Sequence, residues 1–180
     1  MLEAEQTYIA RAKEGDGEAF GVLYGHYAPA IYRFIAVKVS TRQESEDLMH
    51  EVFLSAWQKL PGFKEQGFPF GSWLYKIARN RVIDYYRTKK VAASIDDEEG
   101  GFDQLADLGA PVEEAIDLNF DLEAVRGALA QLTDEQQEII QLRFVADLSP
   151  AEIAGIVGKR EGTVRIIQFR ALKKLQEILQ

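Results

Sequence analysis

The chain has 180 residues, a formal net charge of −8 at pH 7 and no cysteine. This length allows one or two small domains, and the lack of cysteine excludes a disulfide framework and thiolate metal sites. No apolar run approaches the roughly 20 residues of a membrane span, and residues 1–20 are charged rather than signal-like. We therefore expect a soluble, cytosolic protein without membrane insertion.

Charge is segregated along the chain rather than spread evenly. Residues 73–90 and residues 159–174 each carry six basic residues and one acidic residue. Between them, residues 91–125 carry eleven acidic residues and no basic residue. The global acidity therefore hides two local cationic segments, which is the pattern to examine for nucleic-acid binding.

Two helices are predicted before residue 40. The first spans residues 3–13 and ends at Gly15, and the second begins after Asp16 with apolar and aromatic residues at helical spacing. Pro29 lies inside the second helix, where an interior proline costs about 3 kcal/mol or more. We therefore expect a kink or a break near Ala28.

A third helix is predicted from the capping box of Thr41 and Glu44 to about Leu60. Its spacing predicts a buried side made of Leu48, Val52, Phe53, Ala56, Trp57 and Leu60. The side chains predicted to lie outside are Glu46, Asp47, His50, Glu51 and Ser55.

A loop rich in glycine and phenylalanine, residues 61–71, precedes a helix that mixes aromatic with basic residues. Such a surface suits single-stranded nucleic acid, but core aromatics beside a solvated charged face give the same pattern and, on this helix alone, are favoured. The loop's Phe63, Phe68 and Phe70 either fill the core or shape a pocket for an extruded base. The side chains that can face a core are Trp73, Leu74, Ile77, Ala78 and Tyr85. Those that fall mostly on another side are Lys76, Arg79, Asn80, Ile83 and Arg87.

Residues 91–118 are too acidic and too interrupted by glycine and proline to build a core, which predicts a flexible acidic linker. A helix is expected from Leu122 to Leu132, and a capping box at Thr133 and Gln136 begins another that ends at Phe144. The chain is thus predicted to be all-α, with small helical domains at residues 1–90 and 119–180.

The last segment predicts two helices joined by a tight turn. Ser149 and Glu152 form a capping box with Pro150 at the first helical position, and Gly158 can end that helix. A second, basic helix opens at residues 162–163, with an apolar stripe made of Val164, Ile167, Ala171 and Leu175. This spacing describes a helix-turn-helix, with an ordinary helical hairpin as the alternative.

Enzymatic motifs are absent from the sequence. Asp47 and His50 have the spacing of a carboxylate–histidine pair, but a di-metal centre in a bundle needs that motif twice and further glutamates. There is no GxxxxGK[ST], GxSxG or HExxH segment. We expect no metal, no cofactor and no catalysis by this chain alone.

Three blocks together resemble the sigma-70 superfamily in its small two-domain form, the extracytoplasmic-function (ECF) sigma factors. EDLMHEVFLSAWQKL at 46–60 is similar to conserved region 2.2, and FGSWLYKIARNRVIDYYRTKK at 70–90 to regions 2.3 and 2.4. Residues 132–175 are similar to region 4. The order of the blocks, split by an acidic linker, makes this resemblance far more specific than a lone helix-turn-helix.

The resemblance implies partners and roles. It implies binding to core RNA polymerase and to promoter DNA, and an anti-sigma factor as a further partner. On the region 2.2 helix, the polymerase-docking positions are Asp47, His50 and Glu51. Positions that bind the −10 element and help open it are Phe68, Lys76, Arg79, Asn80 and Arg87. Positions in region 4 that meet the −35 element are Lys159, Arg160, Thr163, Arg165, Ile166, Gln168, Phe169 and Arg170.

One departure from the family concerns Ile166 and Ile167, where relatives often carry a small polar and a basic residue. The helical stripe assigns Ile167 to the core, which leaves Ile166 either to touch a thymine methyl or to pack on a neighbour. Gln168 stands at a position that is often apolar and is open to face a base. The −35 sequence therefore does not follow from relatives.

The mechanism predicted from these features is binding rather than bond-making. Two cationic helices hold promoter DNA while the polymerase supplies catalysis, and the acidic linker threads the nucleic-acid channels as a mimic of RNA. The alternative is a helix-turn-helix regulator that works without polymerase. A helical adaptor that binds only protein would leave both basic blocks unexplained.

Overall fold

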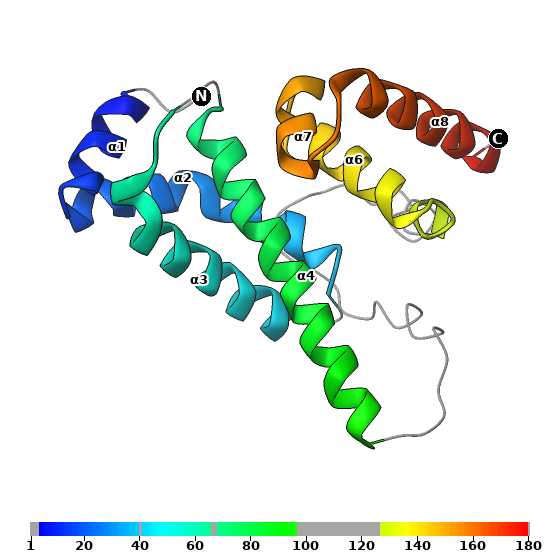
Figure 1. Ribbon diagram of the computed structural model, residues 1–180, viewed down its shortest axis with the longest axis horizontal. Coiled ribbons are helices and arrows are strands. Elements are labelled where there is room, and N and C mark those ends of the chain that lie inside the picture. The colour runs from blue at the N-terminus through cyan, green and yellow to red at the C-terminus, as the bar shows by residue number, and fades with distance from the viewer. Residues whose placement is uncertain (1–3, 40, 66–67, 97–126, 180) are drawn as a thin grey trace. The chain divides into compact units, whose positions relative to one another are not determined.

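The computed structural model describes residues 4–39, 41–65, 68–96 and 127–179. Those residues form helices and turns and no strand, which confirms the all-α prediction. Helices α1 to α4 belong to one compact unit within residues 1–110, and the later helices belong to a second unit within residues 111–180 (Figure 1). The predicted linker from residue 97 onward, and the start of the helix expected at Leu122, lie outside the described residues.

The first unit is built from four α-helices and one short 3₁₀ turn. Their bounds are α1 Glu5–Lys13, α2 Gly17–Ala36, α3 Arg42–Lys59, the turn Leu60–Gly62, and α4 Phe70–Asp96. The ends follow the local signals: Asp16 accepts hydrogen bonds from the backbone at the start of α2, and Thr41 and Glu44 form the predicted capping box of α3. Gly15 lies between α1 and α2 and has a φ of 92°, a conformation that glycine adopts without the cost of a Cβ atom.

Two helices of this unit are longer than the sequence patterns predicted. Helix α2 runs without a break through Pro29, so of the kink or break expected near Ala28, the break is wrong. The neighbours of the proline explain its tolerance, because Ala28 and Ile31 are buried in the core and hold the helix from both sides of it. Helix α4 continues past residue 90 to Asp96, and Figure 1 shows it crossing α3 and extending beyond it.

The core of the first unit combines buried aliphatic side chains with a group of aromatic ones. Phe34 and Phe70 are buried, and the ring of Phe70 lies 5.5 Å from both Tyr27 and Trp73, measured between ring centroids. Each large apolar side chain that is fully buried stabilises a fold by about 1.5–3 kcal/mol. The predicted inward residues Leu74, Ile77 and Ala78 are buried, and Trp73 and Tyr85 are half-buried.

The second unit packs three helices that follow a short helical stretch at residues 127–130. Helix α6 spans Asp134–Phe144, α7 spans Pro150–Val157 and α8 spans Glu161–Leu179, and each packs on the other two. Capping boxes begin α6 at Thr133 and α7 at Ser149, as predicted. The enclosed centre is aliphatic, and its fully buried members are Ile139, Leu142, Ile153, Val164 and Ala171.

Candidate functional site

The outward face of α3 carries the three residues that the resemblance assigned to polymerase docking. Asp47, His50 and Glu51 are all exposed, because steps of three and four residues keep them on one side of the helix. The same steps bring Leu54 onto this face, and 59% of its surface is exposed. Leu54 was not among the predicted docking residues, although its spacing from Asp47 could have revealed it.

Ser55 corrects the predicted outer side of α3. We expected it to lie outside, but it is 2% exposed and belongs to the buried side. A small side chain at this position suits a helix that packs on both α2 and α4. Next to it, Glu51 lies 3.7 Å from Arg81 of α4, in an ion pair whose side chains are half-exposed and which contributes little to stability.

The second candidate surface is the exposed side of α4. Lys76, Asn80 and Arg87 are exposed at helical spacing, and Arg79 is half-buried at the edge of this side. Arg87 is paired with Asp84 one turn before it, at 3.1 Å. Ile83 lies among these polar residues with 46% of its surface exposed, so an apolar side chain stands in the middle of a cationic helix face.

The sequence left two alternatives for Phe63, Phe68 and Phe70, which either fill the core or meet a base, and the three residues differ. Phe63 and Phe70 are buried, with their ring centroids 5.7 Å apart, and they fill the core. Phe68 is 42% exposed, so it is the one of the three that is free to meet a ligand.

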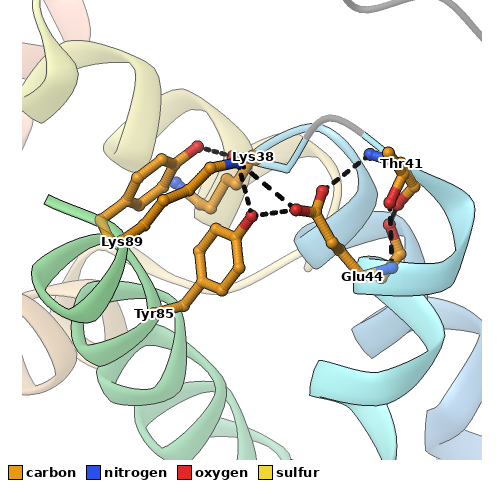
Figure 2. Close-up of polar contacts among 7 residues, drawn as sticks. Lys38, Thr41, Glu44, Tyr85 and Lys89 are labelled. Carbon is orange, nitrogen blue, oxygen red and sulfur yellow. Dashed lines mark hydrogen bonds and ion pairs between the residues drawn. The ribbon is translucent and has the colours of Figure 1, made fainter. Parts of the chain in front are cut away.

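A polar junction joins α3 to α4 where the two helices cross. Figure 2 shows Tyr85 and Lys89 of α4 pointing at the carboxylate of Glu44 on α3. Tyr85 donates a hydrogen bond to that carboxylate, and the ammonium of Lys89 lies 3.4 Å from it. The other carboxylate oxygen accepts from the backbone N–H of Thr41, so Glu44 serves the helix cap and the junction together.

The junction changes the acidity of its members in the directions that their contacts require. The hydrogen bond from Tyr85 lowers the pKa of Glu44, because it stabilises the carboxylate. Burial, followed by the contact with Glu44, raises the pKa of Tyr85. The pKa of Lys89 is raised by its hydrogen bond with Tyr85. The junction therefore favours a charged Glu44 and Lys89 and fixes the crossing of α3 with α4.

The helix-turn-helix is formed by α7 and α8. Gly158 ends α7 with φ 71°, a left-handed conformation that glycine adopts without the cost of a Cβ atom. Val164 and Ala171 of α8 are fully buried, whereas Leu175 is half-buried. Ile167 is also half-buried, so its predicted burial is only partial, and the orientation of the helix is the predicted one.

The face of α8 opposite this buried stripe is a mixed apolar and cationic surface. Ile166 is 53% exposed and Phe169 is 69% exposed. The basic side chains around them are Lys159, Arg160, Arg165, Arg170 and Lys173, all on exposed residues, and Thr163 is exposed as well. Lys173 was left out of the predicted set, and its four-residue step from Phe169 could have found it.

Three of these cations are paired with carboxylates in the free protein. Arg165 contacts Glu161 at 2.6 Å, Lys159 contacts Glu135 at 2.5 Å, and Lys173 lies 4.0 Å from Glu177. Within the described part of the chain, the side chains of Arg160 and Arg170 make no ion pair.

Gln168 is half-buried and lies away from the exposed apolar pair. Successive residues of a helix are about 100° apart, so Gln168 lies roughly 160° around the axis from Ile166. If Ile166 points into the major groove of DNA, Gln168 therefore points away from that groove.

The described residues contain no group of three or more histidine or acidic side chains able to hold a metal ion. Among the same residues, no helix combines the length and hydropathy needed to cross a membrane.

Comparison with known proteins matches both parts of the chain to one family. Residues 23–91 match Sigma-70 region 2, and residues 128–177 match Sigma-70, region 4. The ECF RNA polymerase sigma factor BldN of Streptomyces coelicolor is 34% identical over 171 residues, which are 95% of this chain and 64% of BldN. The ECF RNA polymerase sigma factor SigD of Mycobacterium tuberculosis is 32% identical, over 97% of this chain and 84% of SigD.

A solved structure agrees with these matches. The sigma factor RpoE from Bartonella quintana, in complex with the anti-sigma factor NepR, aligns with a TM-score of 0.72 and 28% identity, over 89% of this chain and 96% of RpoE. The two helical units, one of them a helix-turn-helix, define a DNA-binding class of protein. With both sigma-70 regions matched and relatives above 30% identity, the chain belongs to the ECF sigma factors of RNA polymerase.

Proposed function

We propose that this chain binds core RNA polymerase through α3 and directs it to promoters, with α4 on the −10 element and α8 on the −35 element. The observation that carries the proposal is the presence of three separately exposed faces on the three helices that match regions 2 and 4. The polymerase supplies the catalysis, so the chain works by binding in the cytoplasm, where polymerase and promoter meet.

The docking face on α3 consists of Asp47, His50, Glu51 and Leu54. It combines an exposed leucine with acidic side chains, which suits a partner surface that is apolar at its centre and basic at its rim. On α4, the proposed −10 surface consists of Lys76, Arg79, Asn80 and Arg87, with Phe68 before it. Its cations suit phosphates, and the exposed Phe68 ring can stack on an unpaired base.

An anti-sigma factor is part of the proposal as well. RpoE of Bartonella quintana is solved in complex with one, and it shares the fold over most of this chain. The domain limits at residues 90 and 119, and the linker as a mimic of RNA, also stay proposals.

The test compares variants that differ in one face alone. Asp47→Lys and Leu54→Ala should each weaken binding of the full chain to core polymerase by about tenfold, the loss typical of a contact at the centre of an interface. The matched control is Glu14→Lys, which changes the charge equally at an exposed position beyond the C-terminal end of α1.

Circular dichroism of each variant verifies that the helices are intact, because exposed substitutions leave folding nearly unchanged. If polymerase binding is unaffected by both α3 variants, the assignment of the docking face to α3 is wrong. If the wild-type chain binds promoter DNA but not core polymerase, it is the polymerase-independent regulator instead.

A further inference from the structure

The most exposed apolar pair on α8 is Ile166 and Phe169. These residues are three positions apart on one helix, so their side chains are neighbours on its surface. Both lie on the side opposite the fully buried Val164 and Ala171, with 53% and 69% of their surfaces exposed. More than half of each side chain's surface is therefore not used in packing and is available to a ligand.

The surroundings of the pair select the kind of ligand. Arg165, Arg170 and Lys173 are exposed beside it, so the patch is apolar at its centre and cationic at its rim. A cationic rim complements phosphates, which flank the major groove on both sides. Ile166 lies in the second turn of α8, which begins at Glu161, and Phe169 lies in the third, and the N-terminal turns of a recognition helix are those that reach base edges.

The chemistry of the groove then limits what the pair can recognise. Neither an aliphatic nor an aromatic hydrocarbon side chain donates or accepts a hydrogen bond. In the major groove, the one apolar group on a base edge is the C5-methyl of thymine, whereas cytosine presents an amino donor that such a contact would leave unpaired. We propose that Ile166 and Phe169 select thymine in the −35 element through its C5-methyl group. The proposal rests on the proposed function, which places α8 on that element.

The experiment uses holoenzyme reconstituted from the full chain and core polymerase. A duplex pool randomised over the promoter region gives the −35 sequence that the wild-type holoenzyme selects. Each thymine of that element, on either strand, is then replaced by deoxyuridine, which removes the methyl group and keeps every hydrogen-bonding group. At one or two positions the replacement should weaken binding about three- to fivefold, the effect expected for one buried methyl group.

Variants then connect that loss to the side chains. Ile166→Ser should bind thymine and deoxyuridine duplexes alike at the sensitive position, because the apolar contact is gone from both. Leu179→Ser is the control: it removes an equally exposed apolar side chain of the same helix, thirteen residues and about 20 Å further along. It should keep the full preference for thymine.

Two results would overturn the inference. One is a −35 element whose thymines can all be replaced by deoxyuridine without loss, or an element that contains only G·C pairs. The other is an unchanged thymine preference in Ile166→Ser and in Phe169→Ala. A holoenzyme that forms but shows no −35 preference removes the proposed role of α8 and the inference with it, whereas the first two results leave that role standing.

Discussion

Helix α4 buries aromatic side chains in the core of the first unit, whereas α8 presents its single phenylalanine to solvent. Both helices are basic and both carry apolar residues at helical spacing. In α4, Phe70 and Tyr75 are enclosed and Trp73 is half-buried, so most of its aromatic residues hold the helix in place. In α8, aliphatic side chains hold the helix and Phe169 lies on the outer face. Aromatic residues among cations therefore indicate a binding surface only when they lie off the buried stripe.

The largest expected effect comes from the same substitution made in both helices. Phe70→Ala should cost about 3–5 kcal/mol of unfolding free energy, because it empties an enclosed aromatic site. Phe169→Ala should change stability by no more than about 0.5 kcal/mol, because its ring lies in solvent.

The chain supplies a probe for each unit. Both tryptophans, Trp57 and Trp73, are in the first unit, so their fluorescence follows the unfolding that Phe70→Ala affects. Helicity followed by circular dichroism reports both units, so the part of its transition that tryptophan fluorescence does not follow reports the second unit and Phe169→Ala. Equal costs for the two substitutions would remove the contrast between the helices.

A second pair of substitutions sharpens the orientation of α8. Ile167→Ala should cost about 1–2 kcal/mol, less than the 2–5 kcal/mol of a fully enclosed isoleucine, because Ile167 is half-buried. Ile166→Ala should stay within about 0.5 kcal/mol. The adjacent position and identical change make each variant the control for the other in a thermal melt. A larger loss from Ile166→Ala would mean that the helix is rotated and that the DNA-facing side has been misassigned.

The smallest effect is expected at the junction that fixes α4 on α3. Glu44→Gln keeps an acceptor for the helix cap but loses the charge beside Lys89, and should cost less than about 1 kcal/mol at neutral pH. The pKa of Glu44 is lower in the folded chain than its ordinary value of 4.5. Its charge therefore stabilises the fold above that value, and this stability is lost as the pH falls through the lowered pKa.

Denaturant unfolding at neutral and acid pH, followed by tryptophan fluorescence, measures this difference. The gap between wild type and Glu44→Gln should narrow toward acid pH. Glu14→Gln is the control, because the carboxylate of Glu14 has no hydrogen bond or ion pair within the described part of the chain. A gap that is the same at both pH values would show that the charge of Glu44 contributes nothing to the junction.

The sequence predicted well the features that depend on a few adjacent residues. The capping boxes at Thr41, Thr133 and Ser149 and the glycine at 158 are formed as expected, because cap and helix start lie within one turn of each other. The outward position of Asp47 likewise follows from the helical repeat alone.

The features that the sequence did not predict depend on packing neighbours that are distant along the chain. Ser55 is buried because of how α3 packs, and Pro29 is tolerated because the residues around it are held in the core. A loop has no repeat that could separate Phe68 from Phe63. The half-burial of Ile167 reflects how far α6 and α7 cover α8, which no pattern within α8 reports.

The capping boxes of the second unit also have a kinetic consequence. Forming the first turn is the unfavourable step of helix formation, and a cap that satisfies two backbone N–H groups lowers its cost. Helices α6, α7 and α8 follow one another directly, and the most distant pair, α6 with α8, is separated only by residues 145–160, so little chain has to be closed into loops before the contacts form. Units with such local contacts fold in microseconds to milliseconds. We expect this time range for the helix-turn-helix unit, and slower folding for the first unit, where α2 must meet α4 across the longer segment 37–69.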